Sequence, residues 1–217
     1  MMIKSAFILF LKYPERGKVK TRLADVLGDD LACELYTFFL EDLAAVVREV
    51  KAEPMIVYSG PAGAVFSDFP GVACIRQRGS DIGERMYFAF QDVFARGFER
   101  CVLMGSDIPD LPSAFVNDAL AKLDSADVVL GPSTDGGYYL VGCNRDSLRR
   151  TFFSHIPWST AGVFSETRRR IMEAGLISAE LPEWSDIDDP DDLQQYLMRN
   201  ENQTRPSRVM NFLKSRR

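Results

Sequence analysis

The feature that most limits the fold of this chain is its first apolar segment, residues 6–11, in which six apolar side chains follow one another without a polar interruption. A strand with one face in water alternates apolar and polar residues, so this short run predicts a strand covered on both faces of a mainly parallel sheet. The run is too short to cross a membrane, and Lys12 follows it directly. We therefore expect a central strand here and no membrane span.

Similar short apolar runs recur along the chain, separated by segments with helical spacing. They predict further strands at 54–58, 72–75, 101–104, 128–130 and 138–141, and helices at 31–50, 82–98, 112–123, 161–174 and 190–198. This alternation predicts a three-layer α/β/α fold around a mainly parallel, mixed sheet. With 217 residues the chain can form one sizeable core, and we expect a single domain over residues 1–200.

The charge and cysteine content restrict the partners and the compartment. A net charge of -5 argues against a nucleic-acid-binding surface. Residues 201–217 carry five basic residues and one acid, which favours a solvated basic tail over an interaction arm. Four cysteines without a CxxC pair favour free thiols in the cytoplasm. Any of Phe94, Phe98 and Trp158 that proves exposed could form a homodimer interface.

The loop after the first strand is rich in cations. Ligands bind to open α/β sheets at the carboxyl ends of the strands. Five cations follow the first strand, namely Lys12, Arg16, Lys18, Lys20 and Arg22. Lys20 could act as a point charge on a phosphate and Arg22 could pair with two phosphate oxygens, whereas the alternative is a solvated cationic loop. The segment is not a Walker phosphate loop, because Lys12 and Val19 occupy the positions where that motif needs glycine and a hydroxyl residue.

Two acidic loops could meet at the same edge of the sheet. Asp107 and Asp110 follow the strand at 101–104, and carboxylates of this kind suit Mg²⁺ or Mn²⁺. If the later loop is extended, Asp186 and Asp188 project to one side. The competing interpretation makes Asp107 a turn or helix cap and gives Asp189 the cap of the last helix.

Two further residues remain open between a structural and a functional role. Asp135 lies before two glycines that permit close approach of a ligand, and Asp-Gly is equally typical of a hairpin turn. Arg85 lies at a predicted helix start, where it could bind an anion or form a surface salt bridge. His155 is the only histidine, and no local pattern supports a histidine-dependent nucleophile or a zinc site.

Together these segments resemble a known family, over residues from about 4 to 195. The segments are Lys12-Tyr13-Pro14, Gly17-Lys18-Val19-Lys20-Thr21-Arg22-Leu23, Gly83-Glu84-Arg85-Met86, Gly105-Ser106-Asp107-Ile108-Pro109, Asp135-Gly136-Gly137-Tyr138-Tyr139-Leu140, and Asp186-Ile187-Asp188 with Pro190. They resemble the bacterial glycosyltransferase-A-type family of proposed nucleotide-diphospho-sugar transferases. More distant relatives are molybdenum-cofactor and phospholactate guanylyltransferases, whose glycine-rich opening is replaced here by Lys12 to Arg16.

The resemblance implies the nucleotide-diphospho-sugar transferase fold and a transfer of sugar from such a donor to a small-molecule acceptor. The alternative is a nucleotidyltransferase that releases pyrophosphate from a nucleoside triphosphate. The implied nucleotide-binding residues are Lys12, Lys20, Thr21, Arg22 and Arg85; the implied ligands of Mg²⁺ or Mn²⁺ are Asp107, Asp186 and Asp188; the implied catalytic residues are Asp107, Asp110 and Asp135.

Overall fold

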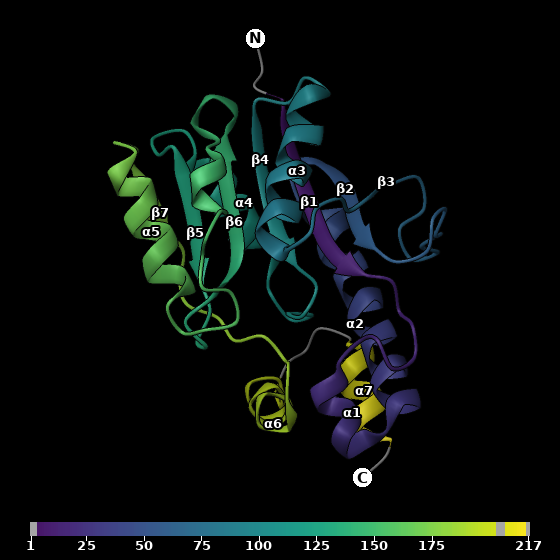
Figure 1. The fold of residues 1–217 in the computed structure, drawn as a ribbon. Helices are drawn as coiled ribbons and strands as arrows, with labels where there is room; N and C mark the ends of the chain where they lie inside the picture. The colour runs from purple at the N-terminus through teal and green to yellow at the C-terminus, as the bar shows by residue number, and fades with distance from the viewer. Residues whose placement is uncertain (1–3, 203–206, 216–217) are drawn as a thin grey trace.

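The computed structural model describes residues 4–202 and 207–215. These residues form one seven-stranded sheet in the order β3-β2-β1-β4-β6-β5-β7 (Figure 1). The strands are β1 Ser5–Lys12, β2 Glu53–Ser59, β3 Ala73–Arg76, β4 Arg100–Gly105, β5 Val128–Pro132, β6 Tyr138–Asn144 and β7 Ser178–Glu180. The first strand lies inside the sheet between β2 and β4, as its uninterrupted apolar run predicts, and the expected mixed α/β sheet is confirmed.

One strand of the sheet runs against the others. β6 pairs antiparallel with both β4 and β5, whereas β1, β2, β3, β4, β5 and β7 share one direction. The reversal occurs in a tight turn, where Asp135 accepts a hydrogen bond of 2.8 Å from the backbone N–H of Gly137 and Gly136 has φ of 86°. The Asp-Gly hairpin interpretation is therefore correct, and it places Asp135 at the edge of the sheet where β1 and β4 end.

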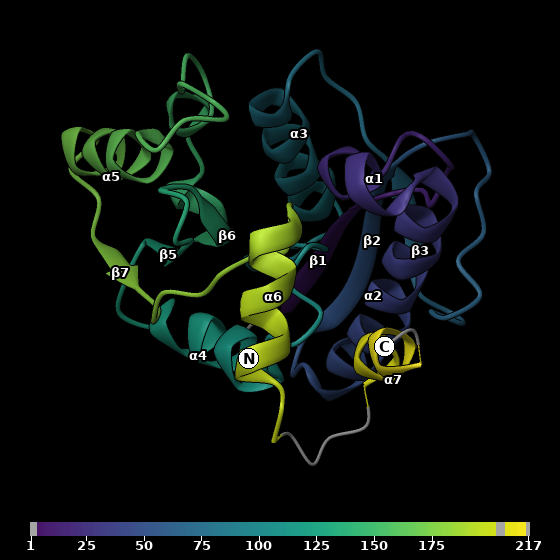
Figure 2. The same ribbon diagram turned by 90° about the horizontal axis from the view of Figure 1, so that it is seen from below.

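Helices cover both faces of the sheet (Figure 2). On one face, α2 (Asp29–Glu49), α4 (Ser113–Lys122) and α7 (Arg208–Lys214) belong to one apolar cluster with Phe7, Leu9 and Leu11 of β1. On the other, α3 (Ile82–Ala95) and α5 (Val163–Glu173) belong to a second cluster with the alternate residues Ala6, Ile8 and Phe10. Both faces of β1 are buried, which is the reason that its sequence does not alternate.

Two helices lie at the ends of the strands that carry the site. The short α1 (Thr21–Leu27) follows the cationic loop and packs against α2. Helix α6 (Pro190–Arg199) begins with the capping box of Asp189 and Asp192, so Asp189 caps this helix as one sequence interpretation proposed. The two remaining elements are the 3₁₀ turns η1 (Arg145–Ser147) and η2 (Arg150–Phe152).

The C-terminal segment differs from the predicted solvated tail. Residues 208–214 form α7, in which Val209, Met210 and Phe212 are buried against α2. Asp42 of α2 accepts hydrogen bonds from the Ser207 hydroxyl and from two backbone N–H groups at the start of α7. The apolar residues between the basic ones therefore dock this segment, while 203–206 and 216–217 lie outside the described residues.

The candidate interface residues are mostly in the core. Phe94 and Phe98 are 8% and 1% exposed, so neither meets the condition of exposure that was set for an interface residue. Trp158 is half-buried and faces a cavity. None of the helices within 4–202 and 207–215 is both long and apolar enough to span a membrane.

Candidate active site

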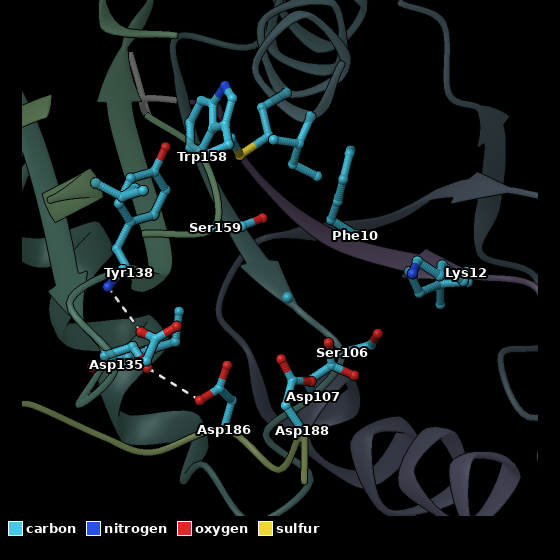
Figure 3. Close-up of a pocket in the computed structure, with 18 of the residues that line it drawn as sticks. Phe10, Lys12, Ser106, Asp107, Asp135, Tyr138, Trp158, Ser159, Asp186 and Asp188 are labelled. Carbon is cyan, nitrogen blue, oxygen red and sulfur yellow. Dashed lines mark hydrogen bonds between the residues drawn. The ribbon is translucent and has the colours of Figure 1, made fainter. Parts of the chain in front are cut away.

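A cavity of about 680 Å³ opens where β1 and β4 end and β6 begins. Lys12 reaches it from the end of β1, Ser106 and Asp107 from the loop after β4, and Tyr138 from the start of β6 (Figure 3). Sequence reasoning placed a site at these strand ends, because backbone groups and loops converge there in open α/β sheets.

Two of the five cations in the loop after β1 are surface residues with carboxylate partners. The Arg16 Nε lies 2.9 Å from the Asp30 carboxylate, and the Lys18 Nζ lies 2.7 Å from the Glu15 carboxylate. Both basic side chains are about two-thirds exposed, and neither lines the larger cavity. For Arg16 and Lys18 the solvated-loop interpretation holds.

Lys12 and Arg22 remain available at the cavity. Both side chains line it together with Thr21, and neither forms an ion pair within the described part of the chain. Their positive charges nevertheless reach Asp188, since both help to lower the pKa of its carboxyl group. Exposed cations at a concave surface, held near acids without being neutralised by them, can bind phosphate oxygens.

Lys20 turns inward instead of facing the solvent. Its backbone has a φ of 49°, in the left-handed region, and its side chain is only 4% exposed. The Nζ donates to the Asp107 carboxylate, to Asp188 at 3.0 Å and to the Ile187 carbonyl at 2.6 Å. Burial alone would lower the pKa of Lys20, but Asp107 and Asp188 outweigh it and raise the pKa. Lys20 is thus an internal counter-ion of the acids at the cavity floor.

The second acidic loop is fixed to the first by its backbone. The Ile187 N–H donates to the Asp107 carbonyl at 2.9 Å, and the Ile187 side chain is fully buried. Asp186 and Asp188, on either side of it, both line the cavity, as an extended segment predicts. Burial, together with the charges of Asp188, Asp135 and Asp107, raises the pKa of Asp186 to about 6. The negative charges of Asp107, Asp135 and Asp188 therefore act together on the Asp186 carboxyl group.

The predicted metal ligands share this cavity without forming a complete set of ligands. Asp107 and Asp188 lie next to each other with Asp186 beside them (Figure 3). Within the described ranges, no group of three acidic, histidine or cysteine side chains could hold a metal ion by itself. The Asp107 and Asp188 carboxylates are both turned toward Lys20. Magnesium sites commonly use one or two carboxylates and complete their coordination with phosphate and water, and this pair fits that pattern.

The two predicted catalytic acids beyond Asp107 have different surroundings. Asp135 lines the cavity, where the N–H of Gly137 holds one of its oxygens. Asp110 is outside the cavity lining, and its side chain is 3% exposed. It accepts hydrogen bonds from Arg199 at 2.5 Å and from Asn200 at 2.8 Å. The structure therefore makes Asp110 an anchor for the end of α6 and does not bring it to the other predicted site residues.

Arg85 and Tyr36 complete the polar surroundings. Arg85 lines the cavity from the first turn of α3 and donates from Nε to the Gly79 carbonyl at 3.3 Å. The Tyr36 hydroxyl lies 2.8 Å from the Ser106 hydroxyl and also bonds to the backbone N–H and carbonyl of Lys12. Tyr36 thereby joins the ends of β1 and β4 from below. Sequence reasoning gave Tyr36 no role.

Comparison with solved structures assigns this fold to a transferase. A protein from Desulfovibrio desulfuricans G20, whose crystal structure is described as that of a proposed nucleotide-diphospho-sugar transferase, is 39% identical to this chain. The match covers 99% of this chain and 95% of that protein, with a TM-score of 0.92. The model of the family described as "Uncharacterized protein conserved in bacteria (DUF2064)" matches residues 42–160. The chain belongs to this bacterial family, which confirms the resemblance seen in the sequence.

More distant structures share the fold. CMP:2-keto-3-deoxy-manno-octonic acid synthetase, solved with CTP, is 16% identical over 91% of this chain and 99% of its own, with a TM-score of 0.59. The Mycobacterium tuberculosis H37Rv protein Rv0371c, solved with manganese, is 16% identical over 90% of this chain and 98% of its own, with a TM-score of 0.56. A comparison with curated proteins finds no match.

Proposed function

We propose that this protein is a metal-dependent glycosyltransferase that moves a sugar from a nucleotide-diphospho-sugar to a small-molecule acceptor. The observation that carries the proposal is the cavity itself, in which Lys12 and Arg22 face a pair of carboxylates, Asp107 and Asp188, across the strand ends. A diphosphate needs cations on its oxygens and a divalent ion that neutralises it, and this arrangement supplies positions for both.

The nucleotide would lie over the end of β1. Lys12, Thr21 and Arg22 would contact the diphosphate, with Arg85 at the edge of the cavity. An adjoining cavity of about 580 Å³ shares Lys12 and Ser59 with the first and extends the space beyond them. We place the nucleoside in this extension. Lys12 and Ser59 form the boundary between the two cavities, and their side chains would contact the ribose and the phosphates.

Mg²⁺ or Mn²⁺ would be held by Asp107 and Asp188 together with diphosphate oxygens, with Asp186 beside them. The hard oxygen donors favour these ions, and one structure with the same fold contains manganese. The bound ion would stabilise the negative charge of the departing diphosphate. Lys20 would hold both carboxylates in position through its contacts with Asp107, Asp188 and the Ile187 carbonyl.

In the transfer, the acceptor oxygen forms a bond to the sugar carbon while the bond from that carbon to the diphosphate oxygen breaks. The diphosphate leaves with the bonding electrons. The acceptor proton passes to Asp135, which lines the cavity and is held in place by Gly137. The products are a glycoside and a nucleoside diphosphate.

Ligand-dependent melting temperatures test the nucleotide site. We expect nucleoside diphosphates and nucleotide sugars to raise the melting temperature with Mn²⁺ present and to do so less after chelation. Arg22→Ala should weaken binding by about 10-fold to 100-fold, because it removes a charge-assisted contact to phosphate. Arg16→Ala is the matched control, because Arg16 is paired with Asp30 outside the cavity, and it should bind like the wild type. Equal losses in both variants would contradict the proposed site.

The released product distinguishes the proposed glycosyl transfer from the alternative, nucleotidyl transfer. A glycosyltransferase releases a nucleoside diphosphate from a nucleotide sugar, whereas a nucleotidyltransferase releases pyrophosphate from a nucleoside triphosphate. Both reactions can be followed in parallel with the same acceptors. Acceptor-dependent pyrophosphate release without nucleoside diphosphate release would replace the proposal with the alternative.

A further inference from the structure

The half of the cavity away from Lys12 is apolar and aromatic. It is lined by Phe10, Met86, Leu103, Tyr138, Val141 and Trp158. Trp158, Tyr138 and Phe10 lie together on one side of the cavity, with the acids on another side and Lys12 apart from them (Figure 3). The ring centroids of Tyr138 and Trp158 are 6.2 Å apart at an interplanar angle of 75°. The nucleotide site proposed above uses none of these side chains.

Helix α5 and the start of α3 hold the side of the cavity that carries Trp158, which we call the Trp158 wall. Arg170 of α5 donates to the carbonyls of Thr151, Ser154 and His155, and so fixes the segment before Trp158 from behind. Gly83 lies directly under the ring, since a Cβ at this position would come within 2.8 Å of it.

The residue after Trp158 fixes the direction of the loop. Ser159 also lines the cavity and has a φ of 64°, in the left-handed region that is unfavourable for serine. Loop, helix and backbone conformation together position the indole before any ligand binds. The fold itself therefore fixes the Trp158 wall of the cavity.

The charges around this half are unfavourable for an anionic ligand. Asp135 and Asp186 lie at its lower edge, and their carboxyl groups already interact with each other electrostatically. Among the described lining residues, Arg85 is the cation nearest in sequence to this wall, on the helix that also carries Met86. Its Nε is engaged by the Gly79 carbonyl. A phosphate or carboxylate group here would face acids without a dedicated cation.

We propose that the apolar half is the acceptor subsite and that it takes an uncharged alcohol whose ring lies against Trp158. The apolar face of the ring packs on the indole, and the hydroxyl points toward Asp135. This inference rests on the proposed sugar transfer and adds to it the chemical class of the acceptor. A sugar ring and a phenolic ring both offer an apolar face and a hydroxyl, and the experiment separates these two sources.

The fluorescence of Trp158 reports on this subsite. Trp184 is the only other tryptophan in the sequence and lies outside the cavity lining, so Trp184→Phe leaves Trp158 as the single indole signal. The protein is saturated with a nucleoside diphosphate and Mg²⁺ and titrated with two matched pairs. Methyl glucoside is compared with glucose 6-phosphate, and phenol is compared with phenyl phosphate.

We expect a saturable change with the uncharged member of one pair, which identifies the source as sugar or phenol. Its affinity should exceed that of the phosphorylated member by about 10-fold or more, and added salt should narrow the difference. Tighter binding of a phosphorylated member, equal binding within both pairs, or no response to either alcohol would overturn the proposal.

A second variant separates this inference from the proposed nucleotide site. Trp158→Ala should lose alcohol binding in calorimetry, while its melting temperature still rises with a nucleoside diphosphate and Mg²⁺. If the wild type binds the nucleotide but neither alcohol, the acceptor inference fails and the nucleotide site remains. If the wild type binds no nucleotide, the proposed function itself fails. Unchanged alcohol binding in Trp158→Ala would also overturn the assignment of the subsite.

Discussion

The most informative perturbation is Lys20→Met, which keeps the length of the buried side chain and removes its charge. The variant loses the contacts of Nζ with Asp107, Asp188 and the Ile187 carbonyl. An unpaired buried carbonyl costs about 1–2 kcal/mol. The two carboxylates are 42% and 44% exposed, so water screens much of the lost attraction. With roughly 0.5–1 kcal/mol for each pair, the total destabilisation is about 2–4 kcal/mol.

The pH dependence identifies the electrostatic part of this loss. Lys20 lowers the folded-state pKa of Asp188, so its contribution is present above the unfolded pKa and is lost as the pH falls through the folded value. The difference between wild type and Lys20→Met should be full at about pH 7 and should shrink below about pH 4, as the Asp188 carboxyl group becomes protonated. The part due to the Ile187 carbonyl remains at every pH.

Urea unfolding at both pH values measures the effect, and Lys18→Met is the matched control. Lys18 pairs with Glu15 on the surface and is 67% exposed, so its replacement should change stability by less than about 0.5 kcal/mol. At neutral pH the Lys20 variant should also melt roughly 5–10 °C below the wild type. Equal effects of the two replacements, or a Lys20 effect that grows as the pH falls, would refute the role of Lys20 as internal counter-ion.

Four further predictions concern three acids and the tyrosine below them. Because the fold raises the pKa of Asp186 to about 6, stability should fall as the pH rises from the unfolded value through 6. Asp186→Asn should therefore be about 2–3 kcal/mol more stable than the wild type at about pH 8 in unfolding without metal, and a gain that is larger at low pH would contradict this. Asp110→Asn leaves Arg199 without its carboxylate and should cost about 3 kcal/mol in unfolding, with normal turnover per folded molecule. By contrast, Asp135→Asn should lower turnover by about 10²-fold to 10⁴-fold in a steady-state assay without weakening nucleotide binding, and the reverse pattern for these two acids would exchange their roles. Tyr36→Phe removes the link between the ends of β1 and β4. It should lower the free energy of unfolding by about 1–2 kcal/mol and weaken nucleotide binding in calorimetry. Unchanged binding would show that the link does not shape the site.

The sequence contained most of the fold, because burial imposes patterns on the chain. The uninterrupted run at 6–11 follows from the two buried faces of β1, and the helical spacing at 31–50 follows from the single buried face of α2. Helix α7 was missed because five basic residues outweighed the apolar Val209, Met210 and Phe212 between them. Its docking depends on Asp42, which is remote in sequence.

The sequence predicted where the site lies, but it did not predict which residue has which role. The spacing of the cations after β1 does not reveal that Lys20 has a left-handed backbone and points inward while Arg22 stays exposed. Asp110 looked like a partner of Asp107 because the two are close in sequence, but Arg199 turns it away from the cavity. The position of Trp158 depends on contacts with Gly83 and other distant residues, which no local pattern records.

The reversed strand β6 limits how this family can vary near its site. Tyr138 packs with the apolar cluster that includes residues of α3 and α5. The next residue, Tyr139, packs on the opposite face, where its ring lies so close to Gly131 that a Cβ there would come within 2.5 Å of it. Inserting or deleting one residue in the turn before β6 would exchange the two tyrosines between faces and drive a different side chain into Gly131. Relatives that keep this cavity should therefore tolerate substitutions in the turn more readily than changes in its length.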